Sequence, residues 1–178
     1  TTLKKDYPQV EEFTRIYASE GDKLVKKGNE YIDEQHIAYV DSTFFNVFTL
    51  PALSGDTRHA LDEPNTVVIT ASTAQKYFGP AKALGKALEI DKKPYKITAV
   101  IKDIPQNSHF HFDFMLSMKN VDYGFGNFLS HNFQTYIVLR PGTDYHDFEN
   151  NFPQIVNNYI YPQAKQFIAC IRRFFEFQ

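Results

Sequence analysis

The stretch TVVITASTAQKYFGP, residues 66–80, carries the strongest structural signal in the chain. Residues 66–70 form an uninterrupted β-branched run, which is typical of a strand buried on both faces. Residues 72–78 show the apolar spacing of a short helix, and the Gly-Pro pair that follows ends it. The stretch therefore predicts a buried strand that leads directly into a short helix.

On both sides of this stretch, the chain alternates short apolar runs with turn residues. Strands are expected at residues 12–17, 23–27, 30–40, 86–90, 95–102, 110–118 and 135–140. Short helices are expected at residues 2–6, after the possible caps at residues 41–43, and from residue 143 or 144 onward. Most loops are too short for the crossovers that parallel strands need. The sequence predicts an α+β fold with mostly antiparallel sheets and short helices.

Composition excludes several classes of protein. With 178 residues, the chain is long enough for one ordinary domain or for two small subdomains that share a core. A net charge of −2 argues against a nucleic-acid partner. The single Cys170 allows no internal disulfide. No apolar run approaches the roughly 20 residues that span a bilayer, so we expect a soluble piece.

Residues 79–87 superficially resemble a phosphate-binding loop. Five residues separate the two glycines where the motif has four, and Ala87 stands where a magnesium-binding hydroxyl is required. The segment also follows a helix and precedes a strand, which is the reverse of the context that the motif needs. We therefore expect a helix stop and a turn here, with no nucleotide site.

The segment HFHFD, residues 109–113, holds the side chains best suited to a metal. His109, His111 and Asp113 would share one face of a strand, and all three are acceptable ligands for a divalent transition metal. A strand with an apolar Phe face and a wet polar face gives the same pattern. We expect no bound metal, no cofactor and no catalytic residues, and these three side chains are the candidates if a metal binds.

Aromatic residues are abundant, with 17 Phe and 11 Tyr. Most fall on apolar faces of the expected strands and helices, which indicates a core. Tyr123, Phe125 and Phe128 instead lie in a segment rich in Gly and Asn, where burial is not assured. These three residues are the candidates for contact with a partner or a substrate.

Four segments taken in order resemble a known family. They are DSTFFNVFTLPALSGD (41–56), ALDEPNTVVITASTAQKYFG (60–79), LGKALEI (84–90) and YKITAVIKDIPQNSHFHFDFMLSM (95–118). The set resembles the MacB-like periplasmic core domain of ABC-transporter permeases of the MacB/FtsX type, in the form found in long permeases of Bacteroidetes. The resemblance extends over residues 3–160.

The resemblance implies an arrangement in two subdomains. A Porter-like subdomain would comprise residues 1–47 and 132–166, and a strand-rich Sabre-like subdomain would comprise residues 48–131. Residues 167–178 depart from the family pattern and form a tail of uncertain role. The family's domain sits between the first two transmembrane helices of a permease, on the periplasmic side of the bacterial inner membrane.

The resemblance also implies a function. The domain would pass ATP-driven conformational change to a substrate or to periplasmic partners, without catalysis of its own. Its partners would be the permease's own transmembrane helices, a separate ATPase subunit, and a periplasmic adaptor or a second permease copy. Two alternatives stay open: a free-standing secreted module that binds lipid or glycan, and a metal-dependent enzyme built on His109, His111 and Asp113.

Overall fold

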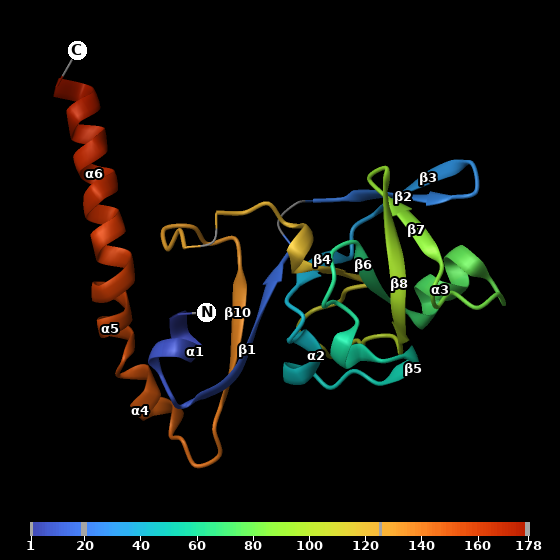
Figure 1. Cartoon of the computed structure of the whole chain (residues 1–178), viewed down its shortest axis with the longest axis horizontal. Coiled ribbons are helices and arrows are strands. Elements are labelled where there is room, and N and C mark those ends of the chain that lie inside the picture. Colours follow the sequence, from blue (N-terminus) through green and yellow to red (C-terminus); the bar gives the residue numbers. More distant parts are fainter. Residues whose placement is uncertain (1, 19–20, 125, 177–178) are drawn as a thin grey trace. The chain divides into compact units, whose positions relative to one another are not determined.

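The computed structural model describes residues 2–18, 21–124 and 126–176, with side chains described as far as residue 168. The chain combines helices and strands (Figure 1), and ten strands of the described residues are joined by hydrogen bonds into a sheet. The strands are β1 (Val10–Tyr17), β2 (Lys23–Lys27), β3 (Glu30–Glu34), β4 (Ile37–Val40), β5 (Ala52–Gly55), β6 (Thr66–Thr70), β7 (Ala87–Ile90), β8 (Lys93–Ile101), β9 (Phe114–Ser117) and β10 (Gln134–Leu139).

Six α-helices accompany the sheet in the described residues. They are α1 (Thr2–Asp6), α2 (Phe44–Val47), α3 (Ala71–Phe78), α4 (Tyr145–Glu149), α5 (Phe152–Ile155) and α6 (Tyr161–Glu176). A π-helical segment, η3 (Val156–Ile160), joins α5 to α6, and two short 3₁₀ turns are η1 (Thr57–His59) and η2 (Met118–Asn120). None of the described helices combines the length and the apolar character that a membrane crossing requires.

Most neighbouring strands of the sheet run antiparallel. The order is β10-β1-β4-β9-β6-β8-β7-β2-β3, and β5 pairs with β8 at the side of this path. The pairs β4–β9 and β6–β8 are parallel, and the other pairs with a described register are antiparallel. The α+β prediction with mostly antiparallel sheets is therefore confirmed.

The unit predicted from residues 66–80 forms as expected. All five residues of β6 are buried, and β8 and β9 flank the strand on its two edges. The Thr70 side chain accepts a hydrogen bond from the Thr73 amide and caps α3. The helix ends at Gly79, whose φ of 58° is a conformation that favours glycine.

Three predictions about strands were wrong. The single strand expected at residues 30–40 is two strands, β3 and β4, which pair with different neighbours. The strand expected at residues 110–118 is restricted to β9, and residues 110–113 are irregular, so their alternating pattern does not define a strand face. Conversely, β5 was not among the strands expected from the sequence. Its residues form a strand because they pair with β8, with a break in register between Ala52 and Ser54.

The chain divides into two compact units. Unit 1 consists of Thr1–Glu11, Tyr123–His131 and Leu139–Gln178, and unit 2 consists of Glu12–Asp122 and Asn132–Val138. The chain therefore passes from one unit to the other four times. The finer division into Porter-like and Sabre-like subdomains stays a prediction.

Unit 2 is built around a core of buried aliphatic and aromatic side chains. Phe44 lies at its centre, fully buried, with its ring 5.1 Å from the Phe48 ring and 5.8 Å from the Phe110 ring. At its margin, the Asp41 carboxylate accepts hydrogen bonds from the Arg15 amide, Nε and Nη2 at 2.7–2.9 Å. This bidentate ion pair fixes the chain beyond β4 against β1.

Candidate functional site: the carboxylate cavity and the cluster at the chain ends

The three candidate metal ligands lie in separate surroundings. His109 Nε2 is 2.9 Å from the Tyr136 hydroxyl, and His111 Nε2 is 3.2 Å from the Gln106 carbonyl oxygen. The Asp113 carboxylate faces His36 Nδ1 at 3.2 Å and accepts a hydrogen bond from Thr70. Nowhere in the described part of the chain do three His, Cys, Asp or Glu side chains converge so as to hold a metal ion.

His111 and Asp113 nevertheless border a common cavity in unit 2, with a volume of about 490 Å³. Both polar and apolar residues line the cavity: His36, Ser72, Asp103, Ile104, Gln106, His111, Phe112 and Asp113. Ser72 Oγ donates to Asp103 Oδ2 at 2.6 Å, and the Ser72 amide donates to Asp103 Oδ1 at 2.9 Å. The Ser72 hydroxyl proton is therefore directed to a carboxylate, and not to an imidazole as in the Ser-His-Asp arrangement.

The two bonds from Ser72 give Asp103 a structural role. Ser72 lies in the first turn of α3, where backbone amides have no partner within the helix. The hydrogen bonds from the Ser72 hydroxyl and amide stabilise the charged carboxylate and lower the pKa of Asp103. Asp103 therefore anchors the start of α3 at this cavity.

We expect Asp103→Ala to lower the free energy of unfolding at pH 7 by about 1 kcal/mol, the usual effect of losing a helix-start acceptor. Since the pKa is lower in the folded state, the contribution is present above about pH 4, the unfolded value. It is lost as the pH falls through the folded pKa. Water screens the exposed carboxylate, so the capping bonds set the size of the effect.

Urea unfolding of the Asp103→Ala variant at pH 7 and near pH 2.5 measures this dependence. The difference from the unmodified chain is expected to shrink at the lower pH. Asp33→Ala removes an exposed carboxylate of β3 and serves as the matched control, with little expected change at either pH. A deficit of the same size at both pH values would contradict the assignment.

The aromatic residues proposed for partner contact lie in unit 1, except that Phe125 falls outside the described residues. Tyr123 is half-buried, and its hydroxyl donates to Ser130. Phe128 is also half-buried, with its ring 5.3 Å from the Tyr159 ring. Its amide donates to Gln163 Oε1 at 2.8 Å. These contacts hold the segment against the helical part of unit 1, and contact with a partner stays a prediction.

Unit 1 joins segments from opposite ends of the chain. We call Asp6, Tyr7, Arg140, Phe148 and Tyr159 the end cluster. The rings of Tyr7 and Phe148, both buried, meet edge to face at 5.8 Å. The Tyr159 hydroxyl donates to the Asp6 carboxylate, across 153 positions of sequence.

In the end cluster, Arg140 also forms hydrogen bonds with the backbone of the segment that precedes β1. The Arg140 amide donates to the Gln9 carbonyl oxygen at 2.8 Å, and Arg140 Nε donates to the Pro8 carbonyl oxygen at 2.8 Å. Sequence reasoning did not find this cluster, because its members lie far apart in the chain and belong to no motif. The segments that precede β1 and follow β10 are thereby held together as one body.

Comparison with known proteins gives the family and the fold. The sequence profile of the MacB-like periplasmic core domain matches residues 1–155. No curated protein matches the sequence. A domain of a permease protein from Porphyromonas gingivalis is similar in structure, with 21% identity and a TM-score of 0.73, over 89% of this chain and 74% of that one.

Two further solved structures have the same fold. The periplasmic region of MacB from Actinobacillus actinomycetemcomitans has 14% identity and a TM-score of 0.66, over 87% of this chain and 69% of that one. The extracellular domain of the noncanonic ABC-type transporter YknZ from Gram-positive bacteria has 16% identity and a TM-score of 0.56, over 78% and 70%. At these identities, the structures establish the fold, and the profile establishes the family. The chain belongs to the MacB-like periplasmic core domains, the extracytoplasmic domains of MacB-like ABC-transporter permeases.

Proposed function

We propose that this domain transmits ATP-driven conformational change from the membrane to a substrate or to extracytoplasmic partners, and that it catalyses no reaction. The observation that carries the proposal is the end cluster. It packs the first and last segments of the domain into one body, from which the rest of the chain extends and to which it returns. Displacement of either end would therefore move unit 1 as a whole.

Motion of unit 1 would reach unit 2 through the four passages of the chain. Two of these passages lie within strands, at residues 11–12 of β1 and at residues 138–139 of β10. A hydrogen-bonded strand passes on a displacement with less slack than a flexible loop does. The transmembrane helices of the same permease chain would supply the motion, on the periplasmic side of the inner membrane. A separate ATPase subunit would drive them.

The recipient of the motion would be a periplasmic adaptor or a second copy of the permease. The half-buried aromatics Tyr123 and Phe128, together with Phe125, are the proposed contact residues. A role without catalysis agrees with the cavity at Asp103, where the serine hydroxyl is engaged by a carboxylate.

Distance measurements between the two units in the full-length permease, reconstituted with its ATPase in nanodiscs, test the proposal. One spin label is placed at Phe167→Cys in α6 and the other at Leu53→Cys in β5, since both side chains are more than half exposed. Cys170→Ser removes the thiol of this domain, and any cysteine elsewhere in the permease is replaced in the same way. We expect the mean distance from pulsed electron resonance to differ between the ATP-bound and nucleotide-free states.

The matched control pairs Leu53→Cys with Leu24→Cys, both exposed and both in unit 2. This distance is expected to stay the same in the two nucleotide states. The ATPase must be active under the conditions of the measurement. If the distance distribution between Phe167→Cys and Leu53→Cys is then the same in both nucleotide states, transmission through the domain is excluded.

A further inference from the structure

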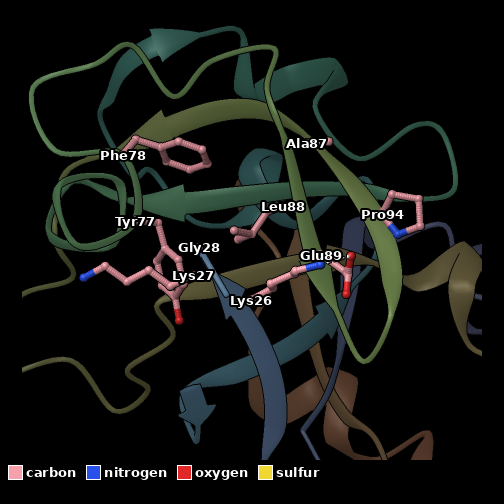
Figure 2. A pocket seen from close by; sticks show the side chains of 9 residues that line it. All are labelled: Lys26, Lys27, Gly28, Tyr77, Phe78, Ala87, Leu88, Glu89 and Pro94. Atoms are coloured by element: carbon pink, nitrogen blue, oxygen red, sulfur yellow. Dashed lines mark hydrogen bonds and ion pairs between the residues drawn. The ribbon is translucent and has the colours of Figure 1, made fainter. Parts of the chain in front are cut away.

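A second hollow of unit 2 has no part in the preceding argument. Its volume is about 350 Å³, and it lies where the last turn of α3 faces β7, β8 and the turn between β2 and β3 (Figure 2). Residues of both apolar and charged character line it: Lys26, Lys27, Gly28, Tyr77, Phe78, Ala87, Leu88, Glu89 and Pro94.

The apolar lining is held in place by the fold. Leu88 of β7 is buried, and Figure 2 shows it near the middle of the hollow, between Phe78 and the pair Lys26 and Glu89. The Tyr77 ring packs edge to face on Phe114 at 5.9 Å, and its hydroxyl donates to Glu34. The surface that a ligand would meet is therefore largely preformed, as in most small-molecule sites.

The carboxylates around the hollow are already engaged. Glu89 faces Lys26 Nζ at 3.4 Å and accepts a hydrogen bond from the Tyr31 hydroxyl, and the hydroxyl and the ammonium lower the pKa of Glu89. Glu34 accepts from Lys76 Nζ at 2.6 Å. Each carboxylate thus has its own cation.

Two further lysines lie at or beside this hollow. Lys27 lines it from the β2 side, and Lys86, which is not a lining residue, has its Nζ 5.1 Å from the centre of the Phe78 ring. No carboxylate among the described residues forms an ion pair with either of them. The rim therefore carries an excess of positive charge next to an aromatic and aliphatic surface, which is complementary to an anion with an apolar body.

We infer that this hollow binds a small anionic amphiphile, whose apolar body packs on Phe78 and Ala87 and whose carboxylate, sulfonate or phosphate group is bound by Lys27 and Lys86. The apolar surface supplies affinity by removing the ligand body from water. The two ammonium groups supply selectivity for an anion through charge-assisted hydrogen bonds. This site is independent of the proposed transmission.

Two fluorescent probes that share one aromatic body test the charge requirement. These are 1-anilinonaphthalene-8-sulfonate and N-phenyl-1-naphthylamine, which lacks the sulfonate. Titrated into the whole chain at low salt, the sulfonate is expected to bind about five- to tenfold more tightly, the contribution of one or two exposed ion pairs. The preference should weaken as salt screens the lysines.

Substitutions in and outside the hollow test whether the two probes bind there. Lys27→Gln combined with Lys86→Gln is expected to bring the two affinities together, whereas Lys102→Gln, outside the hollow, should leave the preference intact. Ala87→Trp, at an exposed rim position of β7, fills the hollow and should weaken both probes. Thermal unfolding of each variant verifies that the fold is retained, since these dyes also bind loosened cores.

Competition by decanoate and by 2-naphthoate identifies the ligand body. If decanoate displaces the sulfonate probe, the ligand body is an acyl chain. If 2-naphthoate displaces it, the ligand body is an aromatic ring system. Either result supports the inference. Equal affinities of the two fluorescent probes, a preference that survives the double lysine variant, or failure of both competitors would overturn it.

Discussion

Alanine in place of Phe44 is expected to lower the free energy of unfolding by about 3–5 kcal/mol, because the fully buried ring leaves a cavity that the core fills only in part. The rings of Phe45, Phe48 and Phe110 lie 5.1–5.8 Å from the Phe44 ring. Three aromatic neighbours therefore lose a contact at once, and edge-to-face packing adds to the loss from burial alone.

Urea unfolding monitored by circular dichroism measures the effect. Leu53→Ala serves as the comparison, since that side chain is 55% exposed and its removal is expected to change stability by less than about 0.5 kcal/mol. A loss below about 1.5 kcal/mol for Phe44→Ala would show that the centre of unit 2 lies elsewhere.

The second large effect is expected for Gly55→Ala in β5. A Cβ at this position would lie 2.4 Å from the Thr98 carbonyl oxygen and 2.8 Å from Ala99 Cα, closer than atoms approach. Because both are backbone atoms of β8, β5 must move away and lose its pairing. The φ of Gly55, +84°, is also unfavourable for alanine, so the substitution adds backbone strain. We expect a loss of about 3 kcal/mol or more.

Gly85→Ala separates the two causes. Gly85 has nearly the same φ, +82°, and a Cβ there would meet no atom within 4 Å. Its substitution should therefore report backbone strain alone, about 1–2 kcal/mol. Hydrogen exchange should show faster exchange of the β5 amides in Gly55→Ala and unchanged protection there in Gly85→Ala. Equal effects of the two substitutions would mean that the close approach is unimportant.

Much of the fold follows from local sequence. The run of β-branched residues in β6 and the Gly-Pro stop after α3 identify these elements without tertiary information. By contrast, β5 has the residues Ala, Leu, Ser and Gly, which carry little preference for a strand, and it forms because β8 offers an open edge. The alternation in residues 110–113 was misleading because strand pairing in the described structure begins only at Phe114.

The sites were harder to predict than the strands. Asp113 has its imidazole partner in His36, at a distance of 77 positions in sequence, and no spacing motif connects them. The hollow beside Phe78 draws its lining from α3, β7, β8 and the turn between β2 and β3. In sequence, Lys27 and Lys86 resemble ordinary solvated lysines, and only the folded chain places Lys27 in the lining of the hollow and Lys86 beside the Phe78 ring.

The end cluster also dictates an order of assembly. A chain that emerges from its N-terminus presents Tyr7 long before Phe148, and Asp6 before Tyr159. Residues 12–138 contain every segment of unit 2, so this unit can condense while the helices of unit 1 that follow β10 are still being made or translocated. Residues 2–11 meet their partners in unit 1 only after those later helices have been made. Closure of unit 1 is thus a late event that marks the completed domain.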